Sequence, residues 1–454
     1  MYLFYSLLLT IGFVVLLPRF ALDALRTRKY VTGLGERLGI LSCPASDRPL
    51  IWLHCVSVGE TEAARPLVRA LRERFPAYRL VISTTTVTGQ AIARRLFAAD
   101  AAAVFYFPID WAWTVRRVLR TLRPAAVLIM ETELWPNLLR TCRQQAIPVA
   151  LVNGRISTKS FRRYRMILPF ISRMLDDLSI AMMQSDQDVS RIRELGISNE
   201  RSLVCGNLKF DNANSAASDR AVSSDIGRRF GFNRGETLIV AASTHWPEER
   251  VVIDSFKQLR QSQAEKRLRL MIAPRHPERF AEVADLLEAS GLTWQRRTAA
   301  PTNGDGNCDV VLLDSIGELR SVFPLADIAF IGGSLVPHGG HNVLEPAAEG
   351  ICVIAGAHTD NFTAVMKAFL EEDALVQLPD ASPSAVVNEL ANAISELLQN
   401  DARRQAIARR AVAVCERNRG ATDRTIKIIA DLLASKSTAS DPVAIPAVHL
   451  TAAK

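Results

Sequence analysis

The sequence predicts an α/β fold with two parallel-sheet domains, because short apolar runs alternate with helical patterns in two separate series. The first series lies between Leu50 and Phe210, and the second runs from about Glu236 to Asn400. A polar stretch rich in small residues, 212–225, separates them and is expected to be a linker. A length of 454 residues accommodates two such domains, and 48% apolar with 22% charged residues is typical of globular proteins.

An apolar run precedes the first series. Residues 1–17 carry no charge, Pro18 ends the run, and basic residues follow at positions 19, 26, 28 and 29. A secretory signal would carry its positive charges before the run and a small-residue cleavage site after it, and this segment has neither. We expect 1–18 to be an uncleaved membrane anchor helix, with the bulk of the chain cytoplasmic. A helix lying in the membrane interface and a helix buried in a protein core remain the alternatives.

The first domain, expected over 19–211, contains six apolar runs that read as strands, with helix-like segments between them. These runs are LIWLHCV (50–56), LVIST (80–84), AVFYFP (103–108), AVLIM (126–130), PVALVN (148–153) and SIAMMQ (179–184).

Polar residues directly follow two of these runs. Ser57, Gly59 and Glu60 belong to a tight turn into a helix after the first run, and Glu131 and Glu133 follow the fourth. Carboxylates at the end of a buried strand are costly unless they face a cleft or find partners. We therefore expect at least one of the latter pair to face a substrate. For Glu60, complementarity to the helix dipole is an equally good explanation.

The stretch 155–173 is basic and amphipathic. It carries six Arg or Lys residues and no acid, interleaved with apolar and aromatic residues. This pattern favours a surface for anionic lipid. Solvated helical charge over a core stripe is the alternative.

The second domain, expected over 226–402, repeats the strand and helix alternation. Its strand candidates are TLIVAAS (237–243), LRLMIAP (268–274), VVLLD (310–314), DIAFIGG (327–333) and ICVIAG (351–356). Helices are expected over 403–435, and the small-residue and proline tail 436–454 is expected to be disordered.

A loop with four glycines joins the fourth of these strands to a helix. The segment IGGSLVPHGGHNVLEPAAEG (331–350) turns at Gly332, Gly333, Gly339 and Gly340, and the helix begins near Asn342. Glycines allow close approach of a ligand to the backbone, and a helix start favours an anion. We expect the loop to bind a nucleotide or a sugar nucleotide. The loop is neither a P-loop nor a GxGxxG fingerprint, and glycine-rich turns of this kind also occur in sheets that bind nothing.

Other loops of this half carry cations. Arg275 and His276 follow LRLMIAP, where they would point toward the same crevice as the glycine loop. A rigid turn made by two prolines is the alternative. The segment STHWPEE (243–249) reads as a helix cap.

The net charge indicates the classes of possible partner, and the cysteine content indicates the state of the thiols. A net charge of +8 and a pI near 9.3 favour nucleic acid, acidic lipid or a phosphorylated substrate. Seven scattered cysteines without a CxxC pair read as reduced thiols, and no metal site is expected.

Taken in order, seven motifs resemble the Kdo transferase family, whose bacterial, membrane-associated members transfer 3-deoxy-D-manno-octulosonic acid (Kdo). The motifs are GLGERLG (33–39), HCVSVGE (54–60), METELWPN (130–137), VNGRIS (152–157), GNLKFD (206–211), APRHPER (273–279) and the glycine loop. The resemblance implies a GT-B fold, with two Rossmann-like domains facing a cleft. It also implies an inverting transfer from CMP-Kdo to the lipid A precursor without a cofactor or metal, at the cytoplasmic face of the inner membrane. Anionic inner-membrane lipid is then a partner and nucleic acid is not.

The resemblance also implies residue roles. Glu36 of the GER motif would be the general base, although the residues alone favour a surface glutamate in a loop. The remaining roles divide between the donor and the acceptor. On the donor side, Arg275 would hold the phosphate or carboxylate, Gly333 and Ser334 would contact the phosphate, Asn342 would lie at the helix start, Glu345 would bind the ribose hydroxyls, and Lys209 would reach across the domain boundary to the anion. Ser57, Gly59, Glu60 and Glu133 would line the acceptor or Kdo side.

Two rival functions remain open. One is another GT-B protein, such as a sugar-nucleotide epimerase or a different lipid-linked glycosyltransferase. The other is a membrane-tethered basic scaffold without catalysis, which would leave the carboxylates at the strand ends unexplained.

Overall fold

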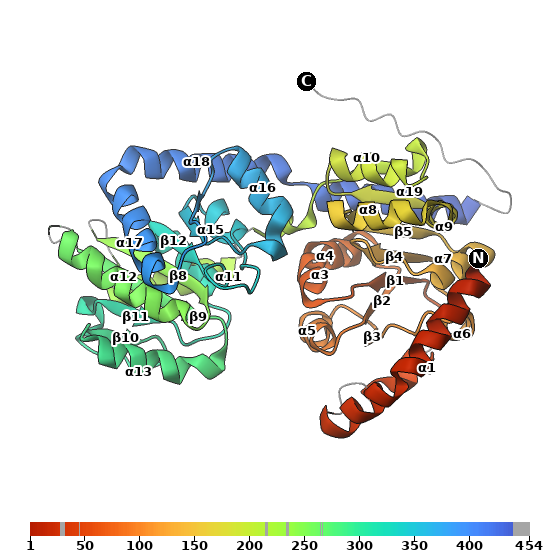
Figure 1. Ribbon diagram of the computed structural model, residues 1–454, viewed down its shortest axis with the longest axis horizontal. Coiled ribbons are helices and arrows are strands. Elements are labelled where there is room, and N and C mark those ends of the chain that lie inside the picture. The colour runs from red at the N-terminus through yellow and green to blue at the C-terminus, as the bar shows by residue number, and fades with distance from the viewer. Residues whose placement is uncertain are drawn as a thin grey trace. The chain divides into compact units, whose positions relative to one another are not determined.

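The computed structural model describes residues 1–27, 32–44, 46–213, 217–232, 236–263, 265 and 267–438. These residues form two compact units. Unit 1 contains Met1–Asn212 and the C-terminal part from Arg419, and unit 2 contains Ala213–Asn418. Each unit is built on a parallel sheet (Figure 1). The expected basic residues Arg28 and Lys29, and most of the expected disordered tail, lie outside the described residues.

Seven parallel strands form the sheet of unit 1. In sheet order they are β3 (Ala103–Tyr106), β2 (Arg79–Thr84), β1 (Leu50–His54), β4 (Ala126–Met130), β5 (Val149–Gly154), β6 (Ile180–Met183) and β7 (Ser202–Val204). Alternate residues of β1 serve two cores: Trp52 packs on one face of the sheet and Leu53 on the other. Burial on both faces explains why this strand reads as a continuous apolar run.

The sheet of unit 2 has the same architecture. Its order is β10 (Trp294–Arg296), β11 (Val310–Leu312), β9 (Leu268–Pro274), β8 (Thr237–Thr244), β12 (Ile328–Ile331), β13 (Cys352–Ala355) and β14 (Val376–Gln377), all parallel. The strand order reverses beside the first strand of each unit, between β1 and β4 and between β8 and β12. Ligands of such sheets bind at the carboxyl ends of strands near this reversal.

Helices connect the strands of both units. In unit 1 they are α1 (Tyr2–Thr27), α2 (Leu34–Arg37), α3 (Val58–Ala63), α4 (Arg65–Arg74), α5 (Val87–Phe97), α6 (Ala112–Leu122), α7 (Pro136–Gln144), α8 (Thr158–Met166), α9 (Leu168–Leu175), α10 (Asp186–Glu194) and α19 (Ala421–Thr438). In unit 2 they are α11 (Ala217–Phe230), α12 (Glu248–Ser262), α13 (Phe280–Ser290), α14 (Leu319–Val322), α15 (Leu344–Ala348), α16 (Thr363–Glu371), α17 (Pro383–Gln399) and α18 (Asp401–Asn418).

Helix α11 replaces much of the loop expected at 212–225. Its residues Ile226 and Phe230 are fully buried, so the helix is part of the core of unit 2. A few isolated apolar residues anchor this helix. The residues around them are polar, and this composition is typical of a linker.

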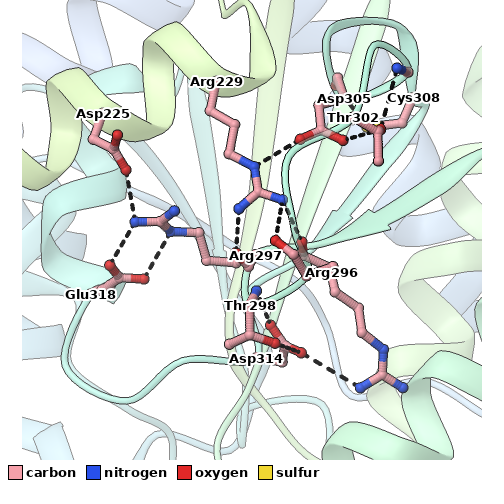
Figure 2. A network of polar contacts seen from close by, with 12 residues as sticks. Asp225, Arg229, Arg296, Arg297, Thr298, Thr302, Asp305, Cys308, Asp314 and Glu318 are labelled. Atoms are coloured by element: carbon pink, nitrogen blue, oxygen red, sulfur yellow. Dashed lines mark hydrogen bonds and ion pairs between the residues drawn. The ribbon is translucent and has the colours of Figure 1, made fainter.

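A polar network also fixes α11 to the edge of the sheet (Figure 2). Arg229 donates from Nε to Asp305 at 2.7 Å and from Nη1 to the carbonyl of Arg297 at 2.6 Å. The Arg297 guanidinium in turn contacts both oxygens of Glu318, at 3.1 and 2.9 Å, and Asp225 of α11 at 2.9 Å. The apolar face of α11 is narrow. The two arginines each form several hydrogen bonds with a fixed direction, and these bonds help to hold the helix in place.

Helix α1 continues through Pro18 to Thr27 rather than ending at the proline. One face lies on unit 1, where Tyr2 donates to Asp177 at 2.5 Å and Trp111 donates to Thr10 at 3.1 Å. The opposite face exposes large apolar side chains: Leu3, Phe4, Leu7, Leu8, Ile11, Val14 and Val15. Within the described part of the chain, no helix combines the length and apolarity needed to cross a bilayer.

The chain returns to unit 1 at its end. Helix α19 packs against α4, and its residues Ile426, Ile429 and Leu433 join the same core as Leu67 and Leu71. The two C-terminal helices therefore belong to different units, since α18 packs on α17 and β13 of unit 2.

Candidate active site

Glu36 lies at the carboxyl edge of the unit 1 sheet. Its Oε2 accepts the main-chain N–H of Tyr106, the last residue of β3, at 2.7 Å. Its Oε1 lies 3.9 Å from the guanidinium of Arg94, and about 29% of the side chain is exposed. One carboxylate oxygen is thus fixed by the backbone while solvent still reaches the side chain, so the carboxylate is held in place and accessible.

The rest of the GLGERLG motif holds α2 against the strand ends. Arg37 lies over the Tyr106 ring at 4.4 Å and donates to the carbonyl of Thr85 at 2.7 Å. Gly33 has a φ of 72°, and a Cβ there would lie 2.0 Å from the Tyr106 ring. A side chain at position 33 would clash with Tyr106, which is why this position needs a glycine. The same close packing holds the motif against the edge of the sheet, although the motif contributes no strand.

The turn after β1 is organised by Glu60. The carboxylate accepts the N–H of Val56 at 2.7 Å and lies 3.3 Å from the hydroxyl of Ser57, with Gly59 between them in the first turn of α3. The carbonyl of Val56 accepts the N–H of Thr85, the residue after β2. The carbonyl of Thr85 accepts a hydrogen bond from Arg37, so Thr85 contacts both this turn and the GLGERLG motif.

Carboxylates gather around Glu60 at the same edge. Burial, together with the charges of Glu131 and Glu133, raises the pKa of Glu60 to about 8. Burial and Glu131 also raise the pKa of Glu133. Burial lowers the pKa of Lys209, which lies among Glu131, Glu60 and Arg155 of its own unit. Four of the residues expected at a site, Ser57, Glu60, Glu133 and Lys209, therefore lie together in unit 1.

Two strand-end residues of unit 1 have left-handed backbone although neither is glycine. Glu131 follows β4 with a φ of 53°, and Asn153 of β5 has a φ of 55°. The Asn153 amide oxygen accepts the N–H of Leu208 at 3.0 Å, which fixes the segment that carries Lys209. Such strain is concentrated at functional sites, and although Asn153 lies in the VNGRIS motif, the sequence analysis assigns it no role.

In unit 2, the glycine loop after β12 is organised by Glu248, a residue that the sequence marked only as part of a helix cap. Its fully buried carboxylate accepts four main-chain N–H groups: His245 (3.0 Å), Gly333 (2.7 Å), Ser334 (3.0 Å) and Leu335 (2.9 Å). Burial raises the pKa of Glu248 and these four hydrogen bonds lower it.

These hydrogen bonds change the reading of Gly333 and Ser334. Their N–H groups, which were expected to face a phosphate, donate to Glu248. The buried Ser334 hydroxyl donates to the Ile331 carbonyl and accepts the N–H of Gly356 at 2.8 Å. Both residues therefore form hydrogen bonds within the protein that stabilise the loop. An anion bound here would contact the side chains around them.

At the end of the loop, the Asn342 amide nitrogen donates to Glu345 at 3.1 Å, and its oxygen accepts the N–H of Leu344 at 3.0 Å. Asn342 thus lies one residue before Val343, the N-cap of α15, where it accepts the first N–H of this helix and orients Glu345 in its first turn.

Four histidines surround the glycine loop. His245 follows β8, His276 follows β9, and His338 and His341 lie in the loop itself. The rings of His276, His338 and His341 have centroids 5.2, 4.5 and 5.0 Å from that of His245. Arg275 is exposed beside them, and its charge acts on His245 and His341. In the described part of the chain, no three His, Cys, Asp or Glu side chains are arranged to hold a metal ion.

The two Rossmann-like sheets and their loops define the class. A UDP-GlcNAc 2-epimerase from Neisseria meningitidis has a similar fold, with a TM-score of 0.55 and 12% identity over 85% of this chain and 100% of that chain. A glycosyltransferase from Rickettsia africae gives a TM-score of 0.54 at 12% identity, covering 87% of this chain and 100% of that one. The fold is therefore GT-B, as the resemblance implied.

The family follows from closer similarities. Residues 32–212 match the model of 3-deoxy-D-manno-octulosonic-acid transferases. A 3-deoxy-D-manno-octulosonic acid transferase from Haemophilus influenzae is 33% identical over 94% of this chain and 97% of its own length. One from Bordetella pertussis is 35% identical over 86% of this chain and 89% of its own. The chain belongs to the 3-deoxy-D-manno-octulosonic acid transferase family, which confirms the resemblance.

Proposed function

We propose that the protein transfers Kdo from CMP-Kdo to the lipid A precursor, with inversion at the anomeric carbon. Family membership supports the donor and the reaction. The observation that carries the proposal is the carboxylate of Glu36, fixed by the Tyr106 N–H at the carboxyl edge of a nucleotide-type sheet. A non-catalytic scaffold would not need a carboxylate there.

The chemistry assigned to Glu36 is general base catalysis. Its Oε1, which lies 3.9 Å from Arg94, takes the proton of the acceptor hydroxyl as the hydroxyl oxygen attacks the anomeric carbon and CMP departs. Tyr106 holds the other oxygen, so the carboxylate does not have to be ordered when the acceptor arrives. The cluster of Glu60, Glu133 and Lys209 would bind the sugar hydroxyls and carboxylate of the Kdo or acceptor side.

Unit 2 is proposed to hold the donor. The N–H groups of Gly333 and Ser334 already donate to Glu248. The phosphate and the Kdo carboxylate would therefore bind Arg275 and the neighbouring histidines. Glu345, oriented by Asn342, would accept the ribose hydroxyls.

We further propose that unit 1 rests on the cytoplasmic face of the inner membrane. The apolar face of α1 would enter the interface, since Leu3 is 88% exposed and Val15 70% exposed. At the end of α8, Met166 is 83% exposed, and Arg162, Arg163 and Arg165 of the same helix are exposed as well. Cations next to an exposed apolar tip suit anionic lipid.

The test is mass spectrometry of the lipid A precursor after incubation with purified protein and CMP-Kdo. The proposal expects a mass increase of one or more Kdo residues. A UDP-sugar in place of CMP-Kdo should give no product. Turnover of the UDP-sugar with no reaction of CMP-Kdo would overturn the assignment in favour of another GT-B activity.

A further inference from the structure

His245 and His341 form a close, half-buried pair in unit 2. Their Nε2 atoms lie 2.7 Å apart, and their ring planes are parallel within 2°. Two bare nitrogen lone pairs would repel at this distance, so one Nε2 carries a hydrogen and the other accepts it. Only one hydrogen fits between the two atoms.

This geometry limits how many protons the pair can bind. In the neutral pair, one ring is protonated at Nε2 and the other at Nδ1. One further proton can enter at the free Nδ1 of the donor ring, which leaves the bridging hydrogen in place and gives a single shared positive charge. A second would have to enter between the Nε2 atoms, and the rings would have to separate.

The surroundings keep the pair neutral in the free protein. Burial and, after it, the charges of His338, His276, Arg275 and Arg279 lower the pKa of His245 to about 4. Burial and, after it, the charges of Arg275, His245, His276 and His338 lower the pKa of His341 to about 3.

Of the cations around the pair, Arg279 is already matched by Glu249 at 3.3 Å. The carboxylate nearest in sequence, Glu248, is buried and accepts four N–H groups. An anion that binds beside the pair would therefore meet Arg275 and the histidine rings, and its charge would oppose the repulsion that excludes the proton.

We propose that binding of the donor's anionic groups at this cluster is coupled to the uptake of one proton by the His245–His341 pair. The coupling rests on the proposed function, which assigns the donor to unit 2. The proton comes from solvent and is returned when the nucleotide leaves, so the pair adjusts the charge of the site to that of its ligand. Donor affinity then rises as the pH falls, by at most about tenfold for each pH unit.

Calorimetric titration with the methyl ester of CMP tests the coupling. This diester carries one fixed phosphate charge near neutral pH, so it does not itself exchange protons. Titrations at about pH 6.5 in buffers of different ionisation enthalpy give the number of protons taken up. The wild-type protein should take up a fraction of a proton that grows toward one at lower pH and never exceeds one.

Variants assign the proton to the pair. His245→Gln and His341→Gln should each abolish most of the uptake and flatten the pH dependence of Kd. His358→Gln, whose ring instead lies 3.7 Å from Asp380, should retain it. Thermal unfolding compares the folding of each variant with that of the wild type.

The possible failures are distinct. Wild-type binding of the diester with no proton uptake, with more than one proton, or with uptake that survives in folded His341→Gln overturns the coupling while the donor assignment stands. Absence of any binding of the diester or of CMP-Kdo overturns the donor assignment and the coupling together.

Discussion

The main-chain N–H of Tyr106 donates to the carboxylate of Glu36 at 2.7 Å, which ties the GER motif to the end of β3. A residue from a segment that contributes no strand is therefore held by the sheet itself. Glu36→Gln keeps a side-chain oxygen to accept this hydrogen bond and removes the base. We expect it to lower the transfer rate by about 100- to 10,000-fold while CMP-Kdo binding stays nearly unchanged.

A radiolabelled transfer assay and a nucleotide-binding titration measure the two effects. Glu62→Gln is the matched control, because Glu62 lies on α3 in the same unit and contacts only Arg65 at the surface among its ion pairs in the described structure. Full activity of Glu36→Gln would refute the base assignment.

The four hydrogen bonds of Glu248 make it the positioning residue of the glycine loop. Glu248→Gln places an amide NH₂ against N–H donors, so at least one of the four bonds is lost. We expect unit 2 to lose about 3 kcal/mol of unfolding free energy in urea, and the affinity for CMP to fall. The exposed Glu278→Gln serves as control. An unchanged urea midpoint together with unchanged CMP affinity would show that the loop keeps its shape without this carboxylate.

Glu60 should make the stability of unit 1 depend on pH. Its folded pKa is raised from 4.5 to about 8, so between these values the folded chain holds a proton that the unfolded chain releases. The free energy of unfolding should therefore fall as the pH rises from about 5 to about 8. Glu60→Gln should reduce this slope, as measured by urea unfolding at several pH values. Glu73→Gln, at an exposed position on α4, should leave it as in the wild type; an identical slope in Glu60→Gln would contradict the raised pKa.

The exposed arginines of α8 should strengthen membrane binding. Reversal of charge in Arg162→Glu with Arg163→Glu should lower partitioning onto anionic vesicles by about tenfold or more, since each cation near the surface contributes about 1 kcal/mol. Co-sedimentation with vesicles of defined anionic content measures this. Arg228→Glu with Arg409→Glu makes the same charge change at exposed positions of unit 2. Equal losses in both double variants would point to net charge rather than to this surface.

Buried strands were the part of the fold most open to prediction from sequence. Every apolar run expected as a strand contains one, because strands covered on both faces must be apolar throughout. The strands missed are the short ones at sheet edges, such as Trp294–Arg296 and Val376–Gln377, where few residues and mixed polarity leave no pattern.

The site was predictable where chemistry follows a strand and not where it depends on contacts distant in sequence. The rule that parallel strands present their carboxyl ends at one edge predicts the positions of Glu60 and Glu133, whereas Lys209 was expected at a site only from the family resemblance. The partners of Glu248 lie 85 to 87 residues further along, at Gly333, Ser334 and Leu335. Nothing in a short segment can reveal such contacts, so the local sequence predicts only a helix cap at this residue.

The return of α19 to unit 1 decides how the protein can be dissected. A fragment ending at residue 212 would lack the helix that covers Leu67 and Leu71, and its apolar groove would invite aggregation. A soluble N-terminal half would have to be made by splicing residues 419–438 onto that fragment. The intervening segment, by contrast, is one uninterrupted piece and can be expressed by ordinary truncation at both ends.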